Sequence, residues 1–295
     1  MSGAAKSRIA FVGLGTMGLR MARRLVAAGY EVVGCDADPA RAAALGSDPA
    51  ATPSAAVDEV AFALTSLPSP AAVAEVVREL GTAARPGTAV VEMSTSPPSL
   101  MRELAAELAE RGVDFLDAPV SGGPVGAETG TLAIMVGGKA QVFERCRPVL
   151  EVLGRLVVHV GGHGTGQTVK LCNNLVVAAE MVALAEGCAI LEREGVDPAL
   201  AYELFTGSTS DSRVLRNRFP IAGVREEHPA TKGYDPMFSL DLLHKDLTLA
   251  LELAREAGVE AGVAARALEA YERARQQGLG DRDYSAVYRV VRPEG

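Results

Sequence analysis

A glycine-rich turn near the start of the chain constrains the fold more than any other feature. Three glycines with the spacing Gly-x-Gly-x-x-Gly follow an apolar run at residues 9–12, in the segment Gly13, Leu14, Gly15, Thr16, Met17 and Gly18. Glycine permits a tight turn and lets the backbone approach a pyrophosphate, which amides at a helix N-terminus can bind. A strand is predicted before this turn and a helix after it, so the turn indicates a dinucleotide site rather than packing alone.

The acidic residue after the next predicted strand indicates which dinucleotide binds. Asp36 follows the β-rich run at residues 31–35. Its carboxylate can accept hydrogen bonds from both hydroxyls of an adenosine ribose and would repel a 2′-phosphate, so NAD is the predicted cofactor. Arg41 leaves NADP open, because a guanidinium there could reach a 2′-phosphate, although a solvated helix cation is the simpler interpretation.

The first half of the chain alternates β-rich and helical runs, which is the pattern of a parallel sheet covered by helices. We expect strands at residues 8–13, 31–35, 60–64, 88–93, 113–116, 132–136 and 156–160. Helices are expected at residues 17–28, 70–80, 99–111 and 140–153, where apolar residues have helical spacing. The loops after the third and fourth strands should border the cofactor at the carboxyl edge of the sheet, through Leu67, Pro68 and Thr95.

Beyond residue 161 every run is helical or irregular. The longest run, residues 167–194, is mostly apolar but carries spaced charges such as Lys170, Glu180 and Glu186, which argues against a membrane span. A helix apolar on most faces must be buried by its own domain or by a partner subunit. We therefore expect an α/β fold: a doubly wound sheet domain at residues 1–163, then an all-α domain at residues 164–295. A long interdomain helix at about residues 165–194 begins the second domain.

Composition excludes several function classes. The 295 residues carry 29 cationic and 37 anionic side chains, and the formal charge of −8 disfavours nucleic acid and anionic membrane surfaces as partners. The polar segment before residue 9 lacks the pattern of a secretory signal, so a cytoplasmic protein is expected. The four cysteines form no Cys-x-x-Cys pair, and no metal site is predicted.

A run of small residues after the fifth predicted strand is a candidate substrate loop. Ser121, Gly122 and Gly123 can turn several backbone amides toward a carboxylate. A proline–glycine turn without a ligand is equally compatible with these residues.

Lysine is scarce in this chain, with five among the 29 cations, and one lysine lies on the long apolar helix. Lys170 and Asn174 are one turn apart on the same face, with Asn173 beside them. Partial burial would make the amine of Lys170 easier to deprotonate, so that it could exchange a proton with an alcohol that Asn174 holds. A lysine that extends along the helix to reach solvent is the alternative.

A second lysine opens a later predicted helix. Lys245 could lie at the nicotinamide end of a site, with Asp246 positioning it. A surface ion pair between these neighbours is the alternative interpretation.

Together these motifs resemble those of the β-hydroxyacid dehydrogenase family, which includes 3-hydroxyisobutyrate dehydrogenase and tartronate semialdehyde reductase. The resemblance spans about residues 9–288 and rests on four segments in the family's order: residues 13–18, 117–123, 164–174 and 244–246. It implies a Rossmann domain, a long connecting helix and a helical second domain, in a homodimer or homotetramer.

The resemblance also implies roles for individual residues. Lys170 would be the catalytic acid/base, and Asn174 would orient the reacting group. The substrate carboxylate would be held by Ser121, Gly122 and Gly123. Lys245 would contact both cofactor and substrate, while Leu67, Pro68 and Thr95 would line the cofactor.

The function implied is hydride transfer between NAD and the hydroxyl-bearing carbon of a small 3-hydroxy acid similar to 3-hydroxyisobutyrate. A semialdehyde or glyoxylate-type reductase of the same fold that uses NADPH is the main alternative. A non-catalytic NAD-binding sensor is a further alternative. Loss of Lys170 or Asn174 would indicate such a sensor, and both residues are present. Residues 213–235 are longer and more polar than the family pattern suggests, which leaves the exact acid open.

Overall fold

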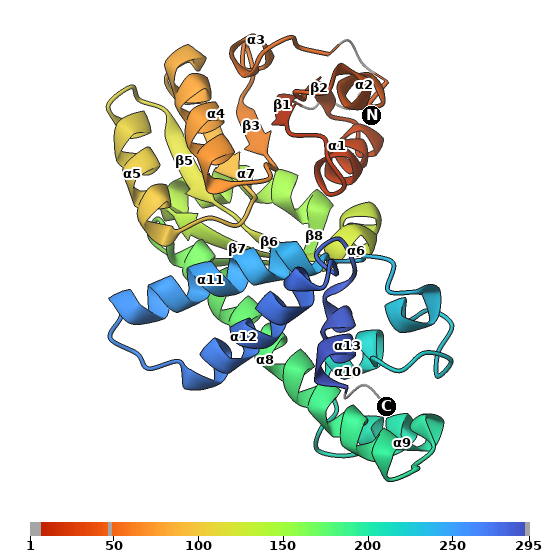
Figure 1. The fold of residues 1–295 in the computed structure, drawn as a ribbon. Coiled ribbons are helices and arrows are strands. Elements are labelled where there is room, and N and C mark those ends of the chain that lie inside the picture. The colour runs from red at the N-terminus through yellow and green to blue at the C-terminus, as the bar shows by residue number, and fades with distance from the viewer. Residues whose placement is uncertain (1–6, 47–48, 293–295) are drawn as a thin grey trace. The chain divides into compact units, whose positions relative to one another are not determined.

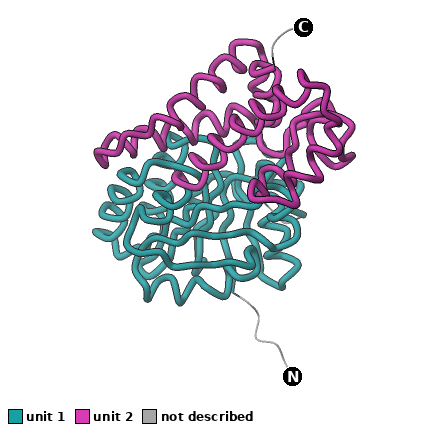
Figure 2. Tube along the Cα trace, turned by 90° about the horizontal axis from the view of Figure 1, so that it is seen from below, with its two compact units in different colours: residues 1–170 teal, residues 171–295 magenta. Residues whose placement is uncertain are grey.

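The computed structural model describes residues 7–46 and 49–292. Residues 1–6, most of the polar segment for which no secretory signal was predicted, lie outside the described residues. The chain divides into two compact units, residues 1–170 and residues 171–295, coloured separately in Figure 2. Each unit has its own hydrophobic core. Figure 1 labels the helices and strands used below.

The first unit is built on a single mixed sheet. Its strand order is β2-β1-β3-β4-β5-β7-β6, and β8 pairs with β7. The first five strands are parallel, β7 is antiparallel to β5 and β6, and β8 is parallel to β7. The strands are β1 (Arg8–Val12), β2 (Glu31–Cys35), β3 (Phe62–Thr65), β4 (Ala89–Glu92), β5 (Asp114–Asp117), β6 (Val120–Ser121), β7 (Leu132–Gly138) and β8 (Gly154–Gly161).

Apolar side chains on both faces of the strands explain why helices cover the sheet on both sides. On β1, Ile9 and Phe11 belong to one buried cluster and Ala10 and Val12 to another, as alternation along a strand requires. The first cluster includes Met21 of α1 and Phe143 of α7, whereas the second is closed by α3, α4 and α5. The helices are α1 (Gly18–Ala27), α2 (Pro39–Ala43), α3 (Pro53–Ala56), α4 (Pro70–Ala83), α5 (Pro98–Ala109), α6 (Gly123–Thr129) and α7 (Ala140–Leu153).

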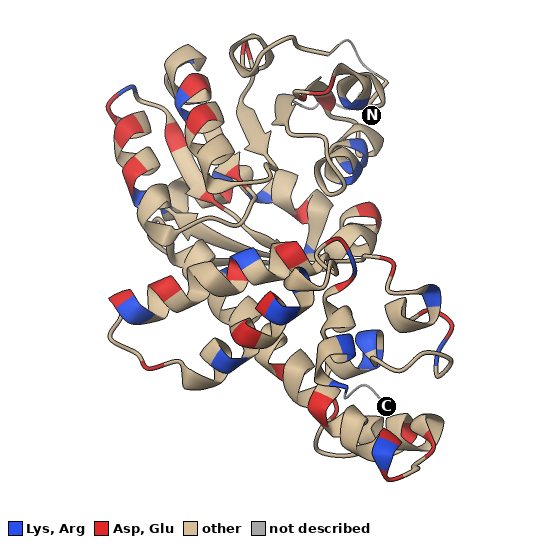
Figure 3. Cartoon of the chain, viewed as in Figure 1, with Lys and Arg blue, Asp and Glu red and all other residues tan. Residues whose placement is uncertain are grey.

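Helices α4 and α5 carry both acidic and basic residues (Figure 3). Arg78 of α4 donates to Glu103 and Glu107 of α5 at 2.5 Å and 2.8 Å. Because these side chains are exposed, the pairs add little to stability and mainly keep the surface soluble.

The second unit is helical. Helix α8 (Thr165–Arg193) begins in the first unit and continues through the second, followed by α9 (Pro198–Thr206), α10 (Arg213–Arg218), η1 (Pro229–Lys232), α11 (Leu240–Glu256), α12 (Gly262–Gln276), η2 (Tyr284–Val287) and α13 (Tyr288–Val291). The core contains Met181 and Cys188 of α8, Leu243 of α11 and Tyr271 of α12. Among described residues beyond 170, the one β-type pairing is an isolated bridge between Ser239 and Asp283.

Helix α8 is long and apolar enough to cross a membrane by length and composition, with a mean hydropathy of 1.7 over its most apolar window. The core helix of a globular protein passes the same test. Ala178, Met181 and Ala185 on its buried face pack into the core of the second unit.

The fold confirms the predicted α/β architecture, with three differences. The sheet is mixed, because residues 118–131 form β6 and the short α6 in place of the helical crossover that a parallel connection needs. Hydrophobic periodicity does not predict α2, α3, α6, α10, α13 or β6, because these elements are too short to show a repeat. The boundary between units falls inside α8 at residue 170, after the predicted position at 163, because the first turn of α8 is hydrogen-bonded to the sheet.

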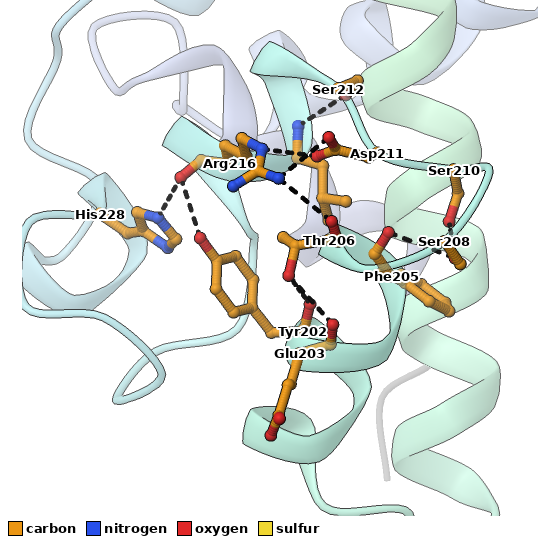
Figure 4. A network of polar contacts seen from close by, with 11 residues as sticks. Tyr202, Glu203, Phe205, Thr206, Ser208, Ser210, Asp211, Ser212, Arg216 and His228 are labelled. Carbon is orange, nitrogen blue, oxygen red and sulfur yellow. Dashed lines mark hydrogen bonds and ion pairs between the residues drawn. The ribbon is translucent and has the colours of Figure 1, made fainter.

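Residues 213–235 fold against α9 (Figure 4). The carbonyl oxygen of Arg216 accepts hydrogen bonds from Tyr202 Oη at 3.3 Å and His228 Nε2 at 2.8 Å. The Arg216 guanidinium binds the Thr206 carbonyl oxygen and Asp211. This polar segment is therefore an ordered part of the second unit.

Candidate functional site

The last residues of five parallel strands form a row across the first unit. Val12 of β1 pairs with Cys35 and Thr65, Thr65 pairs with Glu92, and Glu92 pairs with Asp117. The loops after these strands therefore leave the sheet at one edge, which is where open α/β sheets bind their ligands.

The glycine loop follows β1 at this edge, and each glycine meets a different requirement. Gly13 has a φ of +90°, and a Cβ there would lie 2.3 Å from Ser66 O; at Gly18 a Cβ would lie 1.9 Å from Gly13 O. Around Gly15, in contrast, only the Arg41 guanidinium comes within 4 Å of an added Cβ. Two glycines thus allow close backbone packing, while the middle one leaves room for a pyrophosphate.

The N-terminus of α1 suits a phosphate group. Its N-cap residue, Met17, makes no side-chain hydrogen bond to the helix, and the first turn contains no acidic residue. The partial positive charge of the helix end is therefore available to an anion.

Asp36 is tied directly to the glycine loop. Its Oδ2 accepts a hydrogen bond from Leu14 N at 2.6 Å, and its Oδ1 accepts one from Asp38 N at 2.8 Å. These bonds fix the carboxylate beside the loop, and the remaining lone pairs can accept from ribose hydroxyls. The observed residues therefore fit a dinucleotide with an unphosphorylated ribose.

The loops after β3 and β4 are joined at the same edge. Leu67 N donates to Ser94 Oγ at 2.7 Å, so the Leu67–Pro68 loop and the Ser94–Thr95 loop lie side by side. Leu67 and Thr95 are half-buried, and Pro68 is exposed.

Ser121 ends β6, and two glycines with positive φ follow it. Gly122 has a φ of +138° and Gly123 one of +63°. The chain turns sharply here before α6. Ser121 is half-buried and pairs with Ala133 of β7.

Helix α8 carries Lys170 in its second turn. The side chain is 7% exposed, and Asn174, one turn later, is 3% exposed. Two polar side chains buried on one helix face need polar partners, which is typical of a functional site in an apolar helix.

In the second unit, one buried carboxylate joins α8 to α11. Asp246 Oδ2 accepts a hydrogen bond from Asn174 Nδ2 at 2.6 Å, and Lys245 Nζ lies 2.8 Å from Asp246 Oδ1. Asn173 Nδ2 donates to Asn174 Oδ1 at 3.1 Å. The four predicted polar residues of this unit therefore form one connected network.

A group of buried polar residues at the start of α8 was not predicted from the sequence. Asp117, Gln167 and Glu92 are all fully buried, and they join α8 to β4 and β5 through hydrogen bonds. The available signals were Glu92 near the end of one predicted strand, Asp117 directly after another, and Gln167 in an apolar run. Their contacts span 50 or more residues, so no local pattern pairs them.

Comparison with known proteins gives matches over nearly the whole chain. Residues 8–161 match the model of the NAD-binding domain of 6-phosphogluconate dehydrogenase, and residues 164–291 match the NAD-binding model of NADP-dependent 3-hydroxyisobutyrate dehydrogenase. A 2-(hydroxymethyl)glutarate dehydrogenase from Eubacterium barkeri is 38% identical over 96% of this chain and 94% of its own length.

A solved structure agrees in fold as well as in sequence. The 3-hydroxyisobutyrate dehydrogenase of Mycobacterium tuberculosis, solved with L-serine, has a TM-score of 0.91 and 36% identity, covering 97% of this chain and 99% of its own. The chain belongs to the β-hydroxyacid dehydrogenase family. As a β-hydroxyacid dehydrogenase it is an NAD(P)-dependent oxidoreductase.

Imine reductases share the fold of this β-hydroxyacid dehydrogenase. One from Myxococcus stipitatus, solved with NAD⁺, has a TM-score of 0.62 at 22% identity and covers 97% of this chain and 99% of its own. At that identity the likeness extends to the fold alone.

Proposed function

We propose that the protein oxidises the primary hydroxyl of a small 3-hydroxy acid with NAD, and that Lys170 is the acid/base. The observation that carries this proposal is the buried pair on α8, Lys170 and Asn174, one helical turn apart. A buried amine next to a buried amide is suited to exchanging a proton with an alcohol that the amide holds.

The substrate class is inferred from what the relatives act on. One relative is named an NAD-dependent L-serine dehydrogenase from Pseudomonas aeruginosa and is 36% identical over 97% of this chain and 98% of its own length. L-serine, 3-hydroxyisobutyrate and 2-(hydroxymethyl)glutarate share a CH₂OH group on the carbon that carries the carboxylate. We therefore propose a substrate with this HOCH₂–CH–COO⁻ unit.

In this mechanism, NAD supplies the hydride acceptor when it is bound. The neutral amine of Lys170 accepts the hydroxyl proton as the carbinol carbon loses a hydrogen with its electron pair, which leaves an aldehyde. Asn174 holds the hydroxyl oxygen. The uncharged groups of Ser121, Gly122 and Gly123 hold the carboxylate by hydrogen bonds.

Asp246 positions two of the groups in this scheme. It binds Asn174 Nδ2 through one oxygen and Lys245 Nζ through the other, and it is 3% exposed. We propose that Lys245 contacts cofactor and substrate, and that Asn173 fixes the orientation of the Asn174 amide.

The cofactor is proposed to be NAD rather than NADP. Gly13, Leu14, Gly15, Thr16, Met17 and Gly18 would hold its pyrophosphate, and Leu67, Pro68 and Thr95 would line its nicotinamide half. Asp36 would accept from the ribose hydroxyls and repel a 2′-phosphate. Arg41 pairs with Asp38 at 3.5 Å on the exposed surface beside Gly15, and the Asp38 carboxylate adds negative charge there.

We also propose that the protein forms homodimers or homotetramers through α8. Val169, Val176, Ala183 and Ile190 are exposed and recur at every second turn of the helix. Apolar residues that recur every seven positions on an exposed helix face are typical of a helix that packs against a partner.

A cytoplasmic location is supported by the thiols. Four cysteines are free, and burial raises the pKa of Cys146 and Cys188 to about 12, so these two are inert thiols. Reduced cysteines are typical of cytoplasmic proteins.

An absorbance assay at 340 nm tests the proposal. The enzyme is offered NAD and then NADP with 3-hydroxyisobutyrate, L-serine, D-glycerate and 2-(hydroxymethyl)glutarate. We expect NAD reduction with at least one acid that carries the HOCH₂–CH–COO⁻ unit. The reductase alternative would be favoured if NADPH is oxidised with a semialdehyde or glyoxylate and no hydroxy acid reacts. The sensor alternative would be favoured if neither oxidation nor reduction is detected although NAD binds.

A further inference from the structure

The first turn of α8 is fixed to the sheet by a buried carboxylate. Asp117 is the last residue of β5, and its Oδ1 accepts a hydrogen bond from Gly164 N at 2.7 Å. Its Oδ2 accepts one from Gln167 N at 3.1 Å. These amides belong to the start of α8, where backbone donors have no partner within the helix, so Asp117 caps α8 from a neighbouring strand.

Gln167 provides a second attachment, to the loop after β4. Its Nε2 donates to Ser94 O at 2.8 Å and to Glu92 Oε2 at 3.4 Å, and its Oε1 accepts from Ser96 N at 3.1 Å. The one amide group thus binds the backbone immediately before and immediately after Thr95, which we propose to line the cofactor.

The backbone of this turn packs closely against the backbone of β7 and of the first residue of α5. A Cβ on Gly166 would lie 2.3 Å from Met135 O, and one on Gly164 would lie 2.7 Å from Pro98 O. Sliding or rotation of the turn would create clashes as well as break hydrogen bonds.

A simple helix cap does not need such burial. Asp197 caps α9 through Ala199 N at 2.8 Å from an exposed position. Asp117 is 0% exposed, and burial raises the pKa of its carboxyl against the opposing effect of its two backbone donors. Attachment to two strands also fixes the rotation of the helix about its axis, which one cap cannot do.

Lys170 follows Gln167 by one helical turn, so it lies on the part of α8 whose position and rotation are fixed in this way. We propose that Asp117 and Gln167 are positioning residues that set Lys170 relative to the loop carrying Thr95. This inference rests on the proposed function, in which Lys170 is the acid/base. A proton transfer depends steeply on the distance between donor and acceptor, so small shifts of this turn lower the rate.

The test compares Gln167→Met and Asp117→Asn, both of similar volume to the native residues, with the wild type and the matched cap variant Asp197→Asn. The measurements are kcat, the solvent deuterium isotope effect on kcat, the dissociation constant of NAD and the melting temperature. We expect kcat to fall about tenfold or more in Gln167→Met and Asp117→Asn, the two clamp variants, since each substitution removes hydrogen bonds that fix the orientation of the first turn of α8. The isotope effect should rise because proton transfer becomes slower than the other steps. NAD binding should change less than kcat, because the glycine loop and Asp36 are untouched.

A purely structural role predicts a different result. If the substitutions only unfold part of the protein, kcat falls in proportion to the active fraction and the isotope effect does not change. That result would overturn the proposal. Wild-type kinetics in both clamp variants would also overturn it. Asp197→Asn should keep the wild-type kcat and isotope effect. Lys170→Met is assayed alongside the clamp variants. Full turnover in Lys170→Met would contradict the proposed function itself. Loss of turnover in Lys170→Met, together with wild-type kinetics in the clamp variants, would contradict only the positioning role.

Discussion

Asn174 of α8 donates a 2.6 Å hydrogen bond to Asp246 of α11, and the same carboxylate lies 2.8 Å from Lys245 Nζ. One buried group therefore orients both an amide and an ammonium. Among the predicted site residues of the second unit, Asp246 is the one on which the others depend.

Replacing Asp246 should therefore affect the reaction through Asn174 and Lys245. We expect Asp246→Ala to lower kcat/KM for the hydroxy acid about tenfold or more, because a charge-assisted hydrogen bond contributes roughly 1.5–3 kcal/mol. Steady-state kinetics measure this. Asp241→Ala is the control on the same helix, since Asp241 is exposed and pairs with Arg275 at 2.7 Å. Equal kinetics of the two variants would contradict the role of Asp246.

The cofactor preference depends on Asp36. Asp36→Ala should raise KM for NAD and reduce the NAD to NADP ratio of kcat/KM by about tenfold, since it removes the ribose acceptor and the charge that repels a 2′-phosphate. The ratio is measured at fixed hydroxy acid concentration. Asp58→Ala, at an exposed aspartate paired with Arg85, should keep the wild-type ratio. An unchanged ratio in Asp36→Ala would remove the basis for assigning NAD.

The exposed stripe on α8 predicts the assembly state. Val176 is 59% and Ile190 is 64% exposed. Ile190→Glu should shift the protein toward monomers, because it places a charge in an apolar contact. Sedimentation velocity measures the distribution, with Arg266→Glu on α12 as an exposed control. A wild-type protein that sediments as a monomer would contradict the proposal.

Acid should destabilise the second unit through His228. Burial lowers the pKa of His228, whose Nε2 binds the Arg216 carbonyl oxygen at 2.8 Å. Above its unfolded pKa of about 6.5 the ring is neutral in both states. As the pH falls below that value, the unfolded chain takes up the proton first, so the free energy of unfolding decreases until the lower folded pKa is reached.

Urea unfolding at about pH 8 and about pH 5.5 measures this loss. His228→Gln can still donate a hydrogen bond and does not titrate, so it should lose less stability between the two pH values than the wild type. An equal loss would show that other groups cause it; His244, whose pKa is also lowered by burial, is the first candidate.

Local patterns predicted much of this protein. The strands and long helices of the first unit follow from hydrophobic periodicity, and Gly13, Gly15, Gly18 and Asp36 follow from the strand, turn and helix context. Asp197 and Pro198, adjacent in the chain, are the N-cap and the first residue of α9. These features depend on residues close together in the chain.

Contacts between distant segments were not predictable in the same way. The bonds of Asp117 to the start of α8 and of Gln167 to the loop after β4 join residues 50 or more positions apart, and no local pattern indicates such pairing. The two-residue strand β6 and the antiparallel direction of β7 likewise depend on how strands pair at the edge of the sheet. The exact acid also depends on side chains from separate segments.

The turnover of Lys170→Met tests the central claim most directly. With NAD and the best hydroxy acid, we expect kcat to fall about a hundredfold or more while the dissociation constant of NAD stays near the wild-type value, because the variant loses only its proton acceptor. Lys139→Met, at an exposed lysine in the same unit, should match the wild type. A folded Lys170→Met enzyme that turns over like Lys139→Met would contradict the assignment of Lys170 as the acid/base.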